Sequence, residues 1–321
     1  MELISLDLAN SFVKVSTSTK NDCYINRYRD VKNGGYSLLS VQRDDVYSFN
    51  GVKLSQCDNG TITSSSRSSD RYSTSQFLFE TLIAITKVTN KDHVTLMVGL
   101  PCADMDSSDI KQSVVANLTG THTIEVNGIT RTITIHEVIP NHQPIGTIFD
   151  LLVDSNLTIN EQLLNLNLLV IDLGYGTCDV VSTVGDRIQW SKGFTVGTMT
   201  LVNKYLELIN NKAKTSQLEF TLEDIGVVPN GIINKYQNAY DFSHELNIAR
   251  DYLVKEFNAN LSSNDIKLSA YDCVIFTGGA TTELLKDNYY TLPHNAMVVD
   301  NHQQANVNGL LKLLHYMKRG H

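Results

Sequence analysis

Residues 168–179 read Leu168-Leu169-Val170-Ile171-Asp172-Leu173-Gly174-Tyr175-Gly176-Thr177-Cys178-Asp179. Apolar residues lead into an Asp-x-Gly-x-Gly-Thr-x-Asp pattern, which predicts a buried strand, a glycine turn and a return strand. Glycines let the backbone turn tightly and approach a ligand with no Cβ in the way. A turn of bare amides suits a phosphate, and Asp172 beside it suits a hydrated metal cation.

The same design occurs near the N-terminus, at residues 3–15. Asp7 and Asp172 each end an apolar strand and precede a short turn. A hairpin used twice, about half a chain apart, predicts two related halves that face a common cleft. Lys14 follows on the return strand and is placed to reach phosphates as a point charge. The alternative is two ordinary hairpins with Asp at the turn.

A third segment, residues 272–281, predicts a short apolar strand, a Gly278-Gly279 turn and the start of a helix at Thr281 or Thr282. A Gly-Gly turn at a helix start can lie flat against a base and a sugar. The alternative is a plain connection between a strand and a helix.

In this order the three segments resemble the motifs of the actin-like ATPase superfamily, which includes actin, the heat-shock chaperones and the sugar kinases. Residues 7–14 resemble its first phosphate motif, 172–179 its second and 277–281 its adenosine motif. Residues 138–147 and 305–310 are similar to its two connecting motifs. The resemblance implies an α/β, actin-like ATPase fold with two related RNase H-like halves around a nucleotide cleft.

Within the superfamily the sequence most resembles the bacterial ParM/StbA group, the filament-forming ATPases that segregate plasmids. The features typical of that group are Val98-Gly99-Leu100-Pro101, Gly193 with Gly197 before a helix, and the closing segment 305–309. Ala9 departs from the family pattern, which usually has Gly there, so that turn is expected to be slightly wider. Tyr175 fills a variable position and is expected to alter the contact of its loop with phosphate.

The resemblance implies binding of ATP, with GTP as the alternative, together with Mg²⁺. Asp7 and Asp172 are the implied metal residues and, with Gln143, the implied catalytic residues. The residues implied to contact the nucleotide are Asn10, Ser11, Lys14, Gly174, Tyr175, Gly176, Thr177, Gly278, Gly279 and Ala280. Gln143 resembles the residue that positions the attacking water, and its alternative role is merely to cap a helix. The P-loop pattern Gly-x-x-x-x-Gly-Lys-Ser/Thr does not occur, which removes the commonest class of NTPase.

Three classes of function remain on this evidence: a filament-forming ATPase, a small-molecule kinase of the same fold, and a chaperone-type nucleotide domain. A kinase needs a substrate pocket and an Asp base, and no convincing insertion provides one. A chaperone of this class carries a peptide-binding region after the last motif, and none is expected here. The filament class is therefore preferred, with self-association into a polar filament and a small DNA-binding adaptor at a centromere-like site as the implied partners.

The composition excludes several other classes. The chain has 321 residues, 42% of them hydrophobic, and a net charge of −8. An acidic chain repels the nucleic acid backbone, so direct DNA binding is disfavoured. The five cysteines are scattered without a CxxC pair, which favours a reducing cytoplasm over disulfides or structural zinc. Met1 leads directly into a predicted strand and no apolar run approaches a membrane span, so neither a signal peptide nor a membrane partner is expected.

The domain prediction follows from these motifs. Residues 1–160 form the first domain, with a closing helix at 303–317 packing back onto it, and residues 161–302 form the second. Residues 33–75 are polar and weakly patterned, which predicts a small peripheral subdomain with a mobile loop. A disordered insertion is the alternative for Thr61–Arg71.

Local patterns predict the individual elements. Strands are expected at 2–8, 12–18, 22–28 and 94–98, and a hairpin with strands 121–126 and 130–138 about Asn127-Gly128. A capping box of Ser73 and Gln76 is expected to open a helix that ends near Val88. Further helices are expected at 109–118, 146–153, 196–209 and 242–257.

Overall fold

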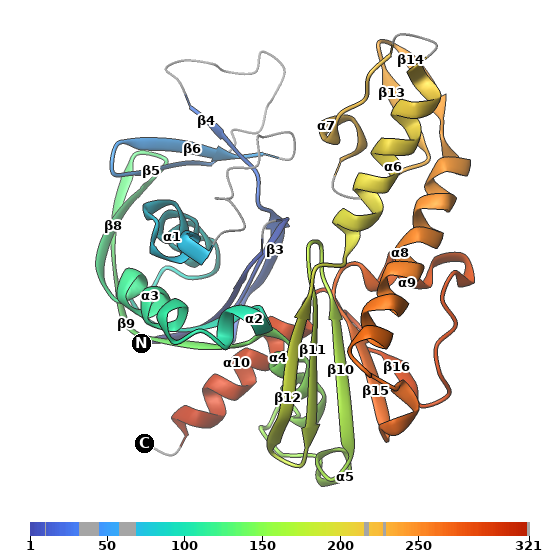
Figure 1. The fold of residues 1–321 in the computed structure, drawn as a ribbon. Helices are drawn as coiled ribbons and strands as arrows, with labels where there is room; N and C mark the ends of the chain where they lie inside the picture. The colour runs from blue at the N-terminus through green and yellow to red at the C-terminus, as the bar shows by residue number, and fades with distance from the viewer. Residues whose placement is uncertain (10, 32–44, 58–68, 215–217, 227–228, 320–321) are drawn as a thin grey trace. The chain divides into compact units, whose positions relative to one another are not determined.

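The computed structural model describes residues 1–9, 11–31, 45–57, 69–214, 218–226 and 229–319. The chain divides into two compact units (Figure 1). Unit 1 comprises Met1–Glu161 and Gln304–His321, and unit 2 comprises Gln162–Gln303. Asn10 and much of the predicted subdomain at 33–75 lie outside the described residues.

In unit 1, nine described strands form one sheet in the order β3-β2-β1-β7-β9-β8-β5-β6-β4. β1 pairs antiparallel with β2 and parallel with β7, which pairs parallel with β9. The strands are β1 (Glu2–Leu8), β2 (Phe12–Ser16), β3 (Asn21–Ile25), β4 (Tyr28–Asp30), β5 (Val46–Phe49), β6 (Val52–Gln56), β7 (His93–Leu100), β8 (Gly120–Val126) and β9 (Ile129–His142). The described part of 33–75 thus contributes β5 and β6 to the main sheet of unit 1.

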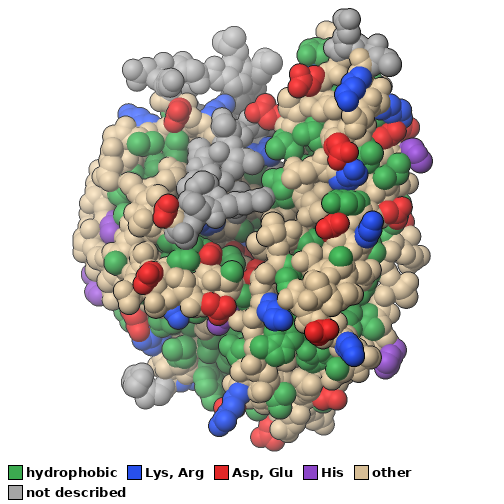
Figure 2. Space-filling view, in the orientation of Figure 1, with side chains coloured by type: hydrophobic (Ala, Val, Ile, Leu, Met, Phe, Trp, Pro, Cys, Tyr) green, Lys and Arg blue, Asp and Glu red, His purple; other side chains and the backbone are tan. Residues whose placement is uncertain are grey.

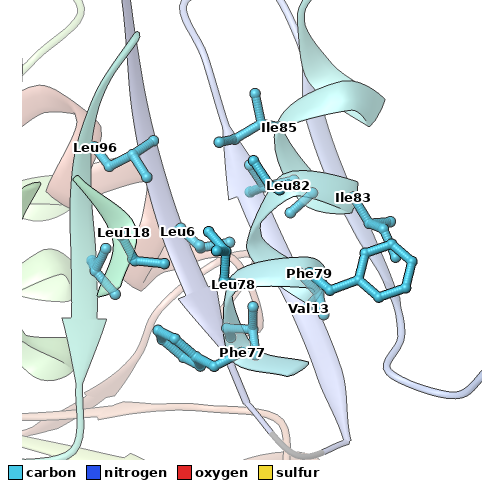
Figure 3. Packing of buried hydrophobic residues seen from close by; sticks show 14 of the residues in the cluster. Leu6, Val13, Phe77, Leu78, Phe79, Leu82, Ile83, Ile85, Leu96 and Leu118 are labelled. Carbon is cyan, nitrogen blue, oxygen red and sulfur yellow. The ribbon is translucent and has the colours of Figure 1, made fainter. Parts of the chain in front are cut away.

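The sheet of unit 1 curves around α1 (Ser75–Val88), as Figure 1 shows. Figure 3 shows α1 side chains such as Phe77 and Leu82 packed against Leu6 and Val13 of β1 and β2. A helix that is apolar on most of its sides is stable only inside a core, so α1 fixes the two strands that flank the first turn. The other helical segments that the structure describes in unit 1 are η1 (Ser69–Ser73), α2 (Cys102–Met105), α3 (Ser108–Leu118), α4 (Gln143–Leu152) and α10 (Ala305–Lys318), and α5 (Glu161–Leu164) spans the unit boundary.

α4 and α10 cross at two glycines. A Cβ on Gly146 would lie 2.0 Å from Asn306 O, and a Cβ on Gly309 would lie 1.7 Å from Gly146 O. The two helix backbones therefore touch, which any larger residue would prevent. Ser5 Oγ donates a hydrogen bond of 2.6 Å to Val307 O and ties α10 to β1 as well.

In unit 2, five described strands form a sheet in the order β12-β11-β10-β15-β16. β10 pairs antiparallel with β11 and parallel with β15, and β15 pairs parallel with β16. These are the order and directions of β3-β2-β1-β7-β9 in unit 1, so the two units are built on the same plan. The strands are β10 (Asn167–Leu173), β11 (Cys178–Val184), β12 (Arg187–Phe194), β15 (Cys273–Thr277) and β16 (Ala296–Val298).

Two long helices, α6 (Thr198–Ala213) and α8 (Ser243–Ser263), run side by side in unit 2 (Figure 1). Their apolar faces and the β10–β11–β15 sheet share one core that includes Leu201, Tyr205 and Phe257. The remaining elements among the described residues of unit 2 are α7 (Leu222–Ile225), the β13 (Ile232–Lys235) and β14 (Asn238–Asp241) hairpin, η3 (Leu268–Ala270), α9 (Thr281–Leu285) and η4 (Lys286–Asn288).

Three local predictions are corrected. The strand expected at 22–28 ends at Ile25, because Asn26 turns its backbone N–H to Ser11 O. The N-cap of α1 is Thr74, which accepts from Phe77 N–H, whereas the Ser73 hydroxyl donates to Asp70 O. The helix expected from Gly146 begins three residues earlier, at Gln143, where the extended β9 ends.

The surface carries both signs of charge. Figure 2 shows Lys and Arg interspersed with Asp and Glu among the coloured residues of the face in view. None of the five cysteines is part of a disulfide. None of the described helices has the length and apolar content that crossing a membrane requires.

Candidate active site

Asp7, at the end of β1, lies at the centre of a polar cluster in unit 1. Its side chain is almost wholly buried, since Asp7 is 1% exposed. Lys14 Nζ donates to Asp7 Oδ2 at 2.7 Å, and Gln143 Nε2 donates to Asp7 Oδ1 at 2.7 Å. Both oxygens of the carboxylate are therefore hydrogen-bonded, which offsets the cost of burying its charge. Three predicted site residues therefore form one cluster, in which Gln143 joins Asp7 across a separation of 136 residues.

The strand register produces the cluster. Asp7 faces Lys14 across β1–β2 and Gly99 across β1–β7. Directly opposed side chains in an antiparallel pair lie on the same face of the sheet, so Lys14 reaches Asp7 without leaving its strand. A Cβ on Gly99 would lie 3.1 Å from Gln143 Cγ, so glycine at this position makes room for the Gln143 side chain.

Asn26 and Arg71, which no sequence pattern indicated, hydrogen-bond to the turn between β1 and β2, called the first turn. Asn26 Nδ2 donates to Ala9 O at 3.1 Å, and Asn26 N–H donates to Ser11 O at 2.9 Å. Arg71 Nη2 donates to Leu8 O. These bonds direct three carbonyls of the turn into unit 1, and Ser11 itself is buried.

Glu80 of α1 anchors this support inside the core. Its Oε2 accepts from Asn26 Nδ2 at 3.4 Å and its Oε1 from Gln76 Nε2 at 2.8 Å. Burial raises the pKa of Glu80, although these two bonds and the charge of Arg71 oppose the shift. The first turn thus rests on a titratable group that is itself buried.

Asp172 takes the corresponding position in unit 2, at the end of β10, and is 6% exposed. It faces Asp179 across β10–β11, and Thr177 Oγ1 donates to Asp179 Oδ2 at 3.1 Å. Gly174 N–H donates to Thr177 O at 2.8 Å and closes the second turn. Burial, followed by the charges of Asp179 and Asp172, raises the pKa of the Cys178 thiol well above its ordinary value, so Cys178 is a core thiol.

The second turn lies against the N-terminus of α6. Thr198 N–H donates to Gly174 O at 3.2 Å, and Met199 N–H donates to Tyr175 O at 2.7 Å. A Cβ on Gly197 would lie 2.5 Å from Gly174 O, so only glycine permits this approach. The first amides of the helix are therefore satisfied by the turn, and the carbonyls of the turn are directed toward α6.

The third predicted segment adjoins Asp172 in the same unit. Gly278 has φ of +88°, and a Cβ on it would lie 2.3 Å from Asp172 Oδ1. Gly279 is exposed, and no atom lies within 4 Å of where its Cβ would be. Ala280 is fully buried and its N–H donates to Leu173 O at 2.9 Å, so this amide supports the turn.

The structure therefore brings the predicted residues into two groups. Unit 1 holds Asp7, Ser11, Lys14 and Gln143. Unit 2 holds Asp172, Gly174, Tyr175, Gly176, Thr177, Gly278, Gly279 and Ala280. Among the described residues, no set of three or more His, Cys, Asp or Glu side chains is arranged to hold a bare metal ion. The predicted meeting of the two groups around one nucleotide is a proposal, taken up below.

Comparison with known proteins agrees with this architecture. Residues 7–146 match the family model described as the actin like proteins N terminal domain. The solved structure of apo psk41 ParM is 21% identical with a TM-score of 0.69, over 99% of this chain and 98% of that chain. An archaeal actin homologue is 16% identical with a TM-score of 0.79, over 98% of this chain and 100% of that chain.

The chain has the actin-like fold. A ParM subunit from a 15-stranded Clostridium botulinum filament is similar to it as well, at 16% identity and a TM-score of 0.78 over 98% of this chain and 99% of that chain. The predicted α/β actin-like fold and the resemblance to ParM are thereby confirmed. A comparison with curated proteins found no match.

Proposed function

We propose that this protein is an ATPase that assembles into filaments in response to nucleotide and segregates plasmid DNA through a DNA-binding adaptor. The observation that carries the proposal is the repeated sheet plan, in which Asp7 and Asp172 end the equivalent strands β1 and β10. Each aspartate adjoins a turn whose carbonyls accept hydrogen bonds from groups of the same unit. This repeat supports one nucleotide bound by both units, with domains at 1–160 and 161–302.

The donor set fits a hydrated Mg²⁺–ATP complex. Gly278 lies against the Asp172 carboxylate, where a Cβ would fall 2.3 Å from Oδ1, so only glycine lets the turn approach this acid. Asp7 and Asp172 would hold the ion largely through its waters, because Mg²⁺ dehydrates reluctantly. The first turn, with Asn10 and Ser11, and the second, with Gly174, Tyr175, Gly176 and Thr177, would bind phosphates, and Gly278 and Gly279 would face the base and ribose. Bound Mg²⁺ would neutralise charge on the transferring phosphoryl group.

Gln143 is the proposed water-positioning residue. Its amide nitrogen donates to Asp7, which fixes the orientation of the amide plane and turns the oxygen away from that carboxylate. The oxygen can then accept a hydrogen bond from a water. An amide is no strong base, so this residue supports slow hydrolysis by positioning.

Assembly is proposed from the solved relatives. ParM from Clostridium botulinum and Alp12 have been solved as filaments, and the archaeal actin homologue has been solved in complex with ADP. A head-to-tail contact that does not close produces an open helical array. Nucleotide that favours one arrangement of the two units would favour one geometry of the contacting surfaces.

The adaptor follows from the charge of the chain. A net charge of −8 disfavours direct contact with the DNA backbone, so a small DNA-binding protein would link the filament to a centromere-like site. Five cysteines without a disulfide fit a reducing compartment, which supports a cytoplasmic location.

The test combines binding and assembly. Right-angle light scattering and sedimentation should increase when Mg²⁺ and ATP or a non-hydrolysable ATP analogue are added, and electron microscopy should show polar filaments. With ATP the signal should decay as phosphate is released, whereas with the analogue it should persist. Repeating the titration with GTP decides between the two nucleotides. A protein that binds Mg²⁺–ATP yet stays monomeric at tens of micromolar would instead favour the small-molecule kinase.

A further inference from the structure

His302 makes four hydrogen-bond contacts with the connection between β15 and α9. Its backbone oxygen accepts from Gly278 N–H at 3.1 Å and from Thr277 Oγ1 at 3.0 Å. Its ring nitrogen Nδ1 lies 2.9 Å from Gly278 O, and Nε2 lies 3.2 Å from Thr282 Oγ1. A single residue thus binds both the N–H and the carbonyl of Gly278, and also both ends of the strand-to-helix connection.

The chemistry of these partners assigns the tautomer of the ring. A carbonyl oxygen only accepts, so Nδ1 of His302 must carry the proton that it donates to Gly278 O. In the neutral ring Nε2 then accepts from the Thr282 hydroxyl, which can donate. All four contacts are therefore satisfied at once.

Gly278, which His302 holds in this way, lies against Asp172 of the proposed metal site. Gly278 is in the left-handed region, at φ of +88°, and its Cα faces Asp172 so closely that a Cβ would lie 2.3 Å from Asp172 Oδ1. Gly278 also lies close to the Leu173 backbone, since the same Cβ would lie 2.4 Å from Leu173 O. The position of this glycine therefore limits the rotation of the Asp172 side chain.

From these contacts we infer that His302 is a positioning residue, which holds the Gly278 turn against Asp172 and so couples the base end of the nucleotide site to its metal end. The inference rests on the proposed function and names a residue that acts on the site without touching the nucleotide. Loss of the His302 ring leaves the Gly278 carbonyl without this donor and lets the turn move away from Asp172. Both the affinity for nucleotide and its dependence on Mg²⁺ should then fall.

Three substitutions separate positioning from mere folding. His302→Ala removes both ring contacts. His302→Asn places an amide N–H near the position of Nδ1 and can restore the bond to Gly278. His302→Gln reaches instead toward Thr282 and does not restore that bond. His294→Ala, at an exposed histidine of the same unit, is the matched control.

Calorimetry with a non-hydrolysable ATP analogue measures the affinity, at protein concentrations where light scattering stays at its baseline, with Mg²⁺ and with EDTA. His302→Ala should lose about tenfold to a hundredfold in affinity with Mg²⁺, the range for residues that orient metal ligands. The loss with EDTA should be smaller. His302→Asn should recover most of the affinity, whereas His302→Gln should not, and His294→Ala should match the parent.

The outcomes distinguish failure of the proposed role of His302 from failure of the proposed function. If the parent protein binds the analogue and His302→Ala binds it equally well, with the same gain from Mg²⁺, the role of His302 is refuted and the proposed function stands. Equal behaviour of the Asn and Gln variants would also refute it. If the parent binds no nucleotide under any of these conditions, the proposed function fails first.

Discussion

Gln143 Nε2 donates a hydrogen bond of 2.7 Å to Asp7 Oδ1, which joins the start of α4 to the end of β1. The proposed water-positioning amide is thus oriented by the proposed metal carboxylate. Lys14 Nζ donates to the other oxygen of Asp7, so this carboxylate is the shared acceptor of both side chains.

Replacement of Gln143 by Ala should slow phosphate release from ATP by roughly tenfold to a thousandfold, the range for losing a positioning group. Affinity for the nucleotide should remain near that of the parent, because the amide acts on water. Steady-state hydrolysis and calorimetry measure the two quantities. Gln189→Ala, at an exposed amide on β12, is the control. Hydrolysis at the parent rate in Gln143→Ala would show that another residue orients the water.

Replacement of Asp172 by Ala should abolish hydrolysis, because the metal loses an anchoring carboxylate. The affinity for an ATP analogue should also lose its dependence on Mg²⁺, which a titration of a fluorescent analogue measures. Asp186→Ala, at an exposed hairpin position of the same unit, should behave as the parent. Mg²⁺-dependent binding that survives in Asp172→Ala would contradict the assignment.

The local elements were predictable where one residue decides the backbone. Asn127 and Gly128 have φ of +53° and +83°, the conformation that an Asn-Gly hairpin turn requires. The cap of α1 was missed by one residue because Ser73 and Thr74 can both cap. Both hydroxyls also donate to a backbone oxygen, Ser73 to Asp70 O and Thr74 to Arg71 O, so the backbone position of the two residues decides which one accepts from the helix. Such competition between neighbouring acceptors leaves no periodic trace in a sequence.

The residues of the candidate site were likewise predictable only in part. Asp7, Asp172 and the glycine turns stand in contiguous motifs, which a single sequence reveals. Asn26 and His302 act through bonds to backbone groups of the turns, at separations of 17 residues for Asn26 to Ala9 and 24 for His302 to Gly278. A carbonyl of any residue can accept such a bond, so no side-chain pattern marks the donor.

Replacement of Gly146 by Ala should destabilise unit 1 by at least about 1–3 kcal/mol, the usual cost of overpacking, because its Cβ would meet the backbone of α10. Far-UV circular dichroism should show a lower melting midpoint. The only tryptophan, Trp190, lies in unit 2, so its fluorescence transition should move less. Gly279→Ala, which adds a Cβ into open space, is the control for stability. Equal melting of the two variants would contradict the close crossing.

Replacement of Glu80 by Gln should change how stability depends on pH. Burial raises the pKa of Glu80 in the folded state, so folding favours the protonated carboxyl. Its contribution is fully present below the ordinary pKa of about 4.5 and is lost as the pH rises through the raised value. Relative to the parent, Glu80→Gln should therefore gain melting temperature as the pH is raised from about 4.5 toward neutrality. Melting curves across that interval provide the measurement, and parallel profiles would contradict the expected shift.

The crossing of α4 and α10 also sets an order of events during translation. α10 follows unit 2 in the chain, yet its backbone contacts Gly146 and its Val307 carbonyl receives Ser5 of β1. The ribosome must therefore synthesise all of unit 2 before α10 can pack on α4 and β1, although the core cluster around α1 contains only residues up to Val138. A nascent chain that has not yet reached Ala305 presents an uncovered helix and strand in place of a finished first unit. If the chain assembles as proposed, a subunit with a complete first unit would arise only after synthesis has passed α10, so assembly would follow release of the finished chain.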